Sequence, residues 1–130
     1  MSQAVLVDTS VWVDHFRNGN PELVRLLTHD QVWCHSMVIG ELACGTPPDR
    51  KNTLADLRAL PQAPQPTPEE VLAFIERFQL YGKGVGLVDV TLLAGTLLQP
   101  GASLWTLDNR LAKLAGSLAI RYHGGLAAQN

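Results

Sequence analysis

Residues 4–17 read Ala-Val-Leu-Val-Asp-Thr-Ser-Val-Trp-Val-Asp-His-Phe-Arg, an apolar run that ends at Asp8 and passes directly into a segment with helical periodicity. The pattern predicts a strand at 5–8 and a helix at 9–17. A short buried strand followed at once by a helix is typical of an α/β domain with a mostly parallel sheet. We therefore expect Asp8 to lie at the carboxyl end of a central strand.

The rest of the chain continues this alternation, with a proline-rich segment at 61–68 that we expect to be an extended edge strand or a loop. Ser36 is the expected cap of one helix, and Thr67 with Glu70 forms the expected capping box of another. The predicted strands are 5–8, 31–35, 103–107 and 119–122, and the predicted helices are 9–17, 21–29, 37–44, 50–60, 68–78, 88–99 and 109–115.

Length and composition set broad limits. A chain of 130 residues and 14.1 kDa is expected to form one domain, residues 1–130, with a core large enough to fold without disulfides. Cys34 and Cys44 are too few for a disulfide framework, and their spacing does not match a CxxC-type zinc site, so we expect free thiols in a reducing compartment. The N-terminal apolar run is too short for a signal peptide or a membrane span. We expect a cytoplasmic protein that does not enter the membrane.

Four carboxylates interrupt otherwise apolar segments, where a lone negative charge is costly to bury. They are Asp8, Glu41, Asp89 and Asp108. If they converge, their mutual repulsion calls for one or two divalent cations, and ligands that are all oxygen favour Mg²⁺ or Mn²⁺. The alternatives that stay open are helix capping for Asp8 and Asp108, and a buried ion pair with an arginine for Glu41 and Asp89.

Net charge leaves nucleic acid possible as a partner. The formal charge is −2, but the remainder of the chain carries +2 once the four carboxylates of the expected metal site are set aside. Arg110 and Lys113 lie one helical turn apart just after Asp108, and they are candidates for contact with RNA phosphates, as is Arg17. Ordinary solvated charge is the open alternative for all three.

Four short motifs in order along the chain resemble those of the PIN-domain ribonucleases, in particular the VapC-type toxins of bacterial toxin-antitoxin pairs. The matching segments contain the four acids in turn and lie at 7–14, 39–45, 86–94 and 104–110. One departure is Leu93-Ala94, where many relatives carry two alanines, which affects helix packing and leaves the chemistry unchanged.

The resemblance implies a PIN-like three-layer α/β/α sandwich with a central, mostly parallel sheet. It also implies a Mg²⁺- or Mn²⁺-dependent endoribonuclease, usually a homodimer, that a VapB-type antitoxin holds inactive. Carried over by motif, Asp8, Glu41, Asp89 and Asp108 are the catalytic and metal-binding acids, Asp108 being the most dispensable, and Ser10 and Thr106 are supporting hydroxyls. The expected substrate is structured RNA of the tRNA or rRNA class, cut by a metal-activated water.

The sequence also fits or excludes several other functions. A catalytically silent PIN-like module that binds RNA or a partner, and an RNA-processing PIN nuclease without an antitoxin, both stay open. A phosphatase that attacks through Asp8 needs a second aspartate where Ser10 stands. A zinc site at Cys34, His35 and Cys44 lacks the usual ligand spacing. The leucine stripe of the helix at 50–60 fits either the core or a surface covered by an antitoxin or a second subunit.

Overall fold

The computed structural model describes residues 3–124, and at its centre is a parallel sheet of three short strands in the order β2-β1-β3. β1 (Val5–Val7) lies between β2 (Val32–Trp33) and β3 (Ser103–Trp105). All three residues of β1 are buried, as expected for a central strand covered on both faces. The predicted domain of residues 1–130 extends at both ends beyond the described residues.

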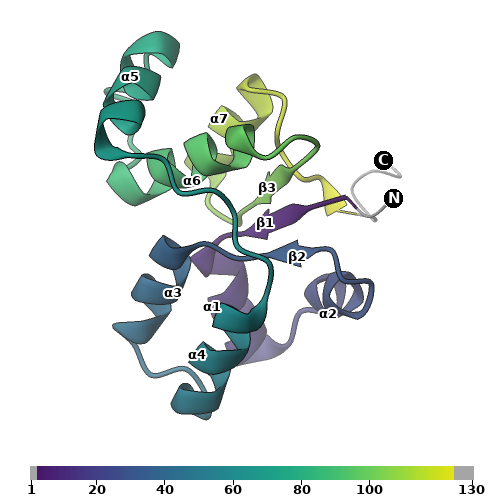
Figure 1. Ribbon diagram of the computed structural model, residues 1–130. Helices are drawn as coiled ribbons and strands as arrows, with labels where there is room; N and C mark the ends of the chain where they lie inside the picture. The colour runs from purple at the N-terminus through teal and green to yellow at the C-terminus, as the bar shows by residue number, and fades with distance from the viewer. Residues whose placement is uncertain (1–2, 125–130) are drawn as a thin grey trace.

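Helices cover both faces of the sheet, which confirms the predicted three-layer α/β/α sandwich. Figure 1 shows α1, α3 and α4 on one side, α6 and α7 on the other, and α5 packed outside α6, while α2 flanks β2. No helix within residues 3–124 is long and apolar enough to cross a membrane. The helices are α1 (Thr9–Asn18), α2 (Pro21–Thr28), α3 (Ser36–Ala43), α4 (Arg50–Ala59), α5 (Pro68–Phe78), α6 (Leu87–Leu98) and α7 (Asn109–Ser117).

The two edges of the sheet are each extended by a single bridge. Gln62 pairs with Cys34 beside β2, so the prediction of an extended edge segment after residue 60 is confirmed. The strand predicted at 119–122 is wrong as a full element, because only Arg121 pairs, with Leu104 of β3. Its neighbour Ala119 has a positive φ of 60°, a turn conformation that prevents regular pairing before that point.

Capping side chains begin two of the helices, and the sequence predicts the cap of α5 correctly and that of α3 wrongly. The capping box is confirmed, since Thr67 Oγ1 accepts from Glu70 N at 3.1 Å and Glu70 Oε1 accepts from Thr67 N at 2.8 Å. Ser36 is not a cap, because it is the first residue of α3 and donates to Gln65. The cap is His35, whose Nδ1 accepts from Met37 N at 3.0 Å.

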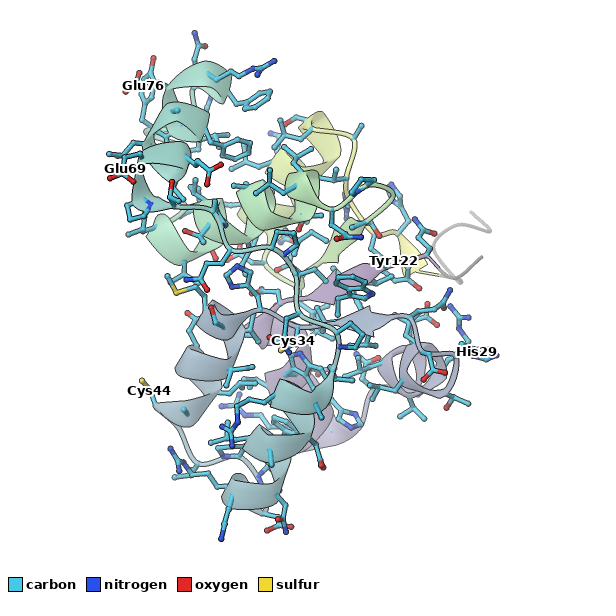
Figure 2. The ribbon with its side chains drawn as sticks, viewed as in Figure 1. His29, Cys34, Cys44, Glu69, Glu76 and Tyr122 are labelled. Atoms are coloured by element: carbon cyan, nitrogen blue, oxygen red, sulfur yellow. The ribbon has the colours of Figure 1, made fainter. Side chains whose placement is uncertain are left out.

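The leucine stripe of α4 belongs to the core, since Leu54 and Leu57 are 6% and 3% exposed. The thiols are free, and a shared zinc site is excluded by their positions. Cys34 is buried inside the molecule, whereas Cys44 is exposed just beyond the far end of α3 (Figure 2). Burial raises the pKa of Cys34 to about 11, so this thiol stays protonated at neutral pH.

Gly95 in α6 lies close to the backbone of Pro64. A Cβ at this position would lie 2.7 Å from the Pro64 carbonyl oxygen and 3.4 Å from the His35 ring. We expect Gly95→Ala to lower the free energy of unfolding by about 1–3 kcal/mol through overpacking. Gly40→Ala in α3, where a Cβ meets nothing within 4 Å, should raise it by about 0.5–1 kcal/mol. Urea unfolding of both variants checks the opposite signs, and stabilisation by both would contradict this packing.

His35 is fully buried, with an exposed fraction of 0%. Its burial lowers its pKa below the usual 6.5, although the Pro64 carbonyl partly offsets this. The unfolded chain therefore takes up the proton first, and this residue makes stability fall as the pH drops below about 6.5. We expect the free energy of unfolding to fall less between pH 7.5 and 5.5 in His35→Asn, whose side chain still caps α3. If the free energy of unfolding fell equally with pH in the variant and the wild type, a neutral buried His35 would be contradicted.

Candidate metal centre at the carboxyl edge of the sheet

The carboxyl ends of β1 and β3 meet at one edge, where Asp8 follows β1 and Thr106 follows β3. The two strands run in parallel with Val7 opposite Trp105, and Asp8 N donates to the Trp105 carbonyl at 2.9 Å. Ligands of open α/β sheets bind beyond this edge because the connections diverge there. The structure thus places Asp8 where the sequence analysis expected a site.

Two hydroxyls hold one oxygen of the Asp8 carboxylate. Ser10 Oγ and Thr106 Oγ1 both donate to Asp8 Oδ2, at 2.8 Å and 2.7 Å. The same hydroxyls accept backbone N–H groups of the segment after β3, from Leu107 at 3.0 Å and from Asp108 at 3.0 Å. Asp8 is only 6% exposed, so these charge-assisted hydrogen bonds offset part of the cost of burying it. The other carboxylate oxygen, Asp8 Oδ1, accepts a hydrogen bond from neither of these hydroxyls.

Helix capping accounts for Asp108, which follows β3, and does not account for Asp8, which follows β1. Asp108 Oδ1 accepts from Arg110 N at 2.9 Å and from Leu111 N at 3.0 Å, so this exposed residue does cap α7. Asp8 occupies the cap position of α1, but its side chain makes no capping hydrogen bond. Its carboxylate is held by hydroxyls instead, and it needs another reason to be charged and buried.

Glu41 lies in the last turn of α3, and Asp89 lies in the first turn of α6. Thr9 Oγ1 donates to Glu41 Oε1 at 2.6 Å, which ties α3 to the start of α1. Asp89, half-buried in the first turn of α6, accepts from Gly86 N at 3.3 Å. Within residues 3–124 neither acid forms an ion pair, so the buried pair with an arginine is excluded there.

The four acids share one electrostatic field, and Asp89 shows it most clearly. Burial raises the pKa of this carboxyl, the Gly86 N–H lowers it, and the charges of Asp8, Asp108 and Glu41 raise it further. Each of the other three acids therefore lies close enough to Asp89 to repel its charge.

The residues fit a hard divalent cation in their chemistry. Carboxylate and hydroxyl oxygens are the ligands that Mg²⁺ and Mn²⁺ prefer, and the repulsion on Asp89 is what a cation would relieve. Within the described part of the chain, no three acidic, histidine or cysteine side chains stand close enough together to hold a metal. A cation would have to draw the carboxylates inward, and the metal-binding roles stay a prediction.

The basic residues singled out in the sequence lie on two sides of this edge. Arg17 lines a cavity of about 470 Å³ together with Thr9 and Glu41. Arg110 and Lys113 line a second cavity, of about 440 Å³, on the side of α7. Sequence reasoning missed Thr9 as the partner of Glu41, because the two are 32 residues apart and no spacing rule connects them.

Thr106→Val tests the hydroxyl pair. The change removes a donor from Asp8 and leaves the Asp108 N–H without its acceptor, while nearly conserving volume. We expect RNA cleavage to fall about 10- to 100-fold, as when a group that orients a metal-binding carboxylate is removed, and the free energy of unfolding to fall by about 1–2 kcal/mol. Thr96→Val is the matched control, since this buried threonine donates to Leu92 O away from the site. An equal loss of activity in both variants would contradict a specific role for Thr106.

Comparisons with known proteins agree with this geometry. No family model matches the chain. The solved structure of PAE2754 from Pyrobaculum aerophilum superposes with a TM-score of 0.60 at 16% identity, covering 92% of this chain and 97% of the other. FitAcB from Neisseria gonorrhoeae gives 0.54 at 18% identity, covering 86% and 93%. At these identities the likeness shows a shared fold, that of the PIN domain.

Sequence similarity to a curated relative is much higher. Ribonuclease VapC32 of Mycobacterium tuberculosis, from strains CDC 1551 and H37Rv, is 47% identical over 107 residues, which cover 82% of this chain and 86% of the relative. This identity extends over most of both chains. The chain therefore belongs to the VapC-type ribonucleases of the PIN-domain fold.

Proposed function

We propose that this protein is a Mg²⁺- or Mn²⁺-dependent endoribonuclease and the toxin of a VapBC-type pair. The observation that supports the proposal is that Asp8 follows β1 and Asp108 follows β3 at the same edge of the sheet, and that burial of Asp89 and the charges of Asp8, Asp108 and Glu41 all raise the pKa of Asp89. Family membership supports the ribonuclease activity, since the relative with 47% identity is named a ribonuclease. The free thiols Cys34 and Cys44 favour action in the cytoplasm.

Phosphodiester hydrolysis needs an activated water, a clamp on the phosphate oxygens and relief of charge on the leaving oxygen, and a bound divalent metal supplies all three. The protein's own contribution is to position the carboxylates. Ser10 and Thr106 fix one oxygen of Asp8, and Thr9 holds Glu41. Each acid that would bind metal is therefore held from outside the centre, as functional metal sites require.

The four acids differ in how freely they offer an oxygen. Asp108 Oδ1 already accepts hydrogen bonds from two backbone N–H groups of α7, and the residue is exposed, so it would bind a cation loosely. Asp8 is buried at the centre of the edge, and Asp89 is half-buried beside it. We infer that Asp8 and Asp89 carry most of the metal binding, that Glu41 assists, and that Asp108 is the most dispensable of the four.

We propose structured RNA of the tRNA or rRNA class as the substrate, cut in single-stranded loops whose bases are accessible. The test uses purified full-length protein on total cellular RNA with Mg²⁺ or Mn²⁺. Discrete fragments from one RNA class support the proposal. Random degradation of all RNA would overturn the substrate class, and intact RNA under both metals would favour the catalytically silent module.

We propose an antitoxin of the VapB type as the inhibitor, on the ground of family membership. Expression of the chain alone should arrest growth, and co-expression with the small open reading frame beside its gene should restore it. A chain that cuts RNA but causes no arrest, or that has no such neighbour, would instead be an RNA-processing nuclease without an antitoxin.

We propose a homodimer that covers an apolar surface between α5, α6 and the segment before α5. Leu72 and Leu87 are each 63% exposed and border an apolar cavity of about 280 Å³. Such apolar exposure on a small domain marks an interface. Leu72→Glu with Leu87→Glu should give a monomer in sedimentation, while Val24→Glu on α2, 48% exposed in the wild type, should leave the dimer intact. A monomeric wild-type protein would overturn the dimer.

A further inference from the structure

The cavity beside α7 has the composition of a nucleotide subsite. Its apolar lining comes from the end of α5 and one face of α7, and its rim is cationic. At about 440 Å³ it lies within the range of roughly 300–1,000 Å³ typical of small-ligand sites. The lining residues are Phe78, Leu80, Lys83, Arg110, Lys113, Leu114, Ser117 and Leu118, and no acid is among them.

The charge around this cavity is concentrated in a chain that is acidic overall. Lys83, Arg110 and Lys113 line it, and the Arg77 guanidinium lies 5.3 Å from the centre of the Phe78 ring. These are four of the ten lysines and arginines in a chain with a net charge of −2. Among the described residues, none of the four forms an ion pair. Four unneutralised cations around one cavity favour an anionic ligand.

The acids of α5 face elsewhere. Figure 2 shows Glu69 and Glu76 on the outer side of α5, away from α7 and the cavity. Glu70 is engaged in the capping box with Thr67. The cationic rim is therefore not cancelled by the nearest helix.

The cavity is joined to the acidic edge through Arg110. Its backbone N–H donates to Asp108 Oδ1 at 2.9 Å, and its Nη1 lies 3.4 Å from the Gly84 carbonyl, in the loop that leads to Asp89. A Cβ at Gly84 would lie 2.8 Å from this Nη1, so the arginine side chain lies directly against the loop. The same side chain thus borders both the loop before Asp89 and the cavity.

The spacing suits a continuous RNA strand. Lys113 is five residues after Asp108, roughly 7 Å along the helix axis at about 1.5 Å per residue. Successive phosphates of one strand advance by about 3.4 Å along the axis of a stacked helix, and their separation through space is larger. A strand with its scissile phosphate at the acids would therefore bring a phosphate to Lys113 within about two nucleotides.

We propose that the cavity between the end of α5 and α7 binds a nucleotide of the RNA substrate next to the scissile phosphate. This rests on the proposed ribonuclease function and adds to it a determinant of substrate binding. Lys83, Arg110 and Lys113 contact phosphate, and the base lies against the exposed part of Phe78 and the apolar side of α7. Aromatic rings and cations of this kind are how proteins hold single-stranded nucleic acid.

The test measures binding apart from cleavage. A fluorescent single-stranded RNA of random sequence is titrated with the full chain in EDTA at several salt concentrations. We expect Lys83→Gln with Lys113→Gln to raise Kd about tenfold and to reduce the salt slope by about 1.4, which is two phosphate contacts at about 0.7 each. Phe78→Leu should raise Kd about fivefold without changing the slope. The charge-matched control is Lys51→Gln with Arg58→Gln on α4.

Cleavage kinetics separate this proposal from the proposed function. If both hold, the lysine double variant raises KM and leaves kcat nearly unchanged. If RNA is cut but Kd, slope and KM equal those of the α4 control, the subsite is overturned and the ribonuclease stands. If no metal gives cleavage but RNA binding still depends on the cavity, the ribonuclease fails and the subsite stands. Equal loss of affinity for polyglutamate and for RNA would overturn the subsite in favour of an acidic protein partner.

Discussion

Asp89→Asn should lower kcat by about a thousandfold or more, while raising the unfolding temperature of the metal-free protein by a few degrees. The loss of activity follows from removing a carboxylate of the proposed metal centre. The gain in stability follows because burial disfavours the charged form of Asp89, and because Asp8, Asp108 and Glu41 repel that charge in the absence of a cation. The amide oxygen of asparagine can still accept from Gly86 N, so the start of α6 is preserved.

RNA cleavage rates and thermal unfolding in a chelator check the two effects together. Asp56→Asn, at an exposed position of α4, is the matched control and should change neither. A variant that fails to fold would show that Asp89 is needed for structure, and a fully active one would remove it from the catalytic centre.

Removal of divalent metal should abolish cleavage, and Mg²⁺ or Mn²⁺ should restore it. The same ions should stabilise the wild-type protein, by about 2.7 kcal/mol at a concentration of 100 times Kd, because only the folded chain assembles the site. Asp89→Asn should show little of this stabilisation, so thermal unfolding with and without metal reads out binding independently of activity. Cleavage that survives chelation, or equal stabilisation of wild type and variant, would contradict the proposed centre.

Much of the fold could be predicted because its signals are local. The apolar run before Asp8 predicts a buried strand, and Thr67, Pro68 and Glu70 predict the start of α5 within their own turn. The four acids were recognised because each interrupts an apolar segment. Topology then brings Asp8 and Asp108 to one edge, since carboxyl ends of parallel strands meet there.

What could not be predicted depends on contacts between distant segments. His35 took the capping role from Ser36 because its ring is enclosed near Gly95 and Pro64, which no local pattern reveals. The bond from Thr9 to Glu41 spans two helices. The strand predicted at 119–122 forms only one bridge, because the chain turns at Ala119. The cavity lined by Lys83 could not be predicted either, because its lining comes from two segments, one before α6 and one after α6 in the sequence.

The central claim is that the acidic edge cuts RNA at defined sites, and a map of new RNA 5′ ends tests it most directly. The wild-type chain and Asp89→Asn are each induced in cells, with equal expression and folding verified, and 5′ ends are mapped across the transcriptome. We predict discrete new ends, concentrated in loops of one structured RNA class, that disappear in the variant. The same ends in both, or none in either, would contradict the claim.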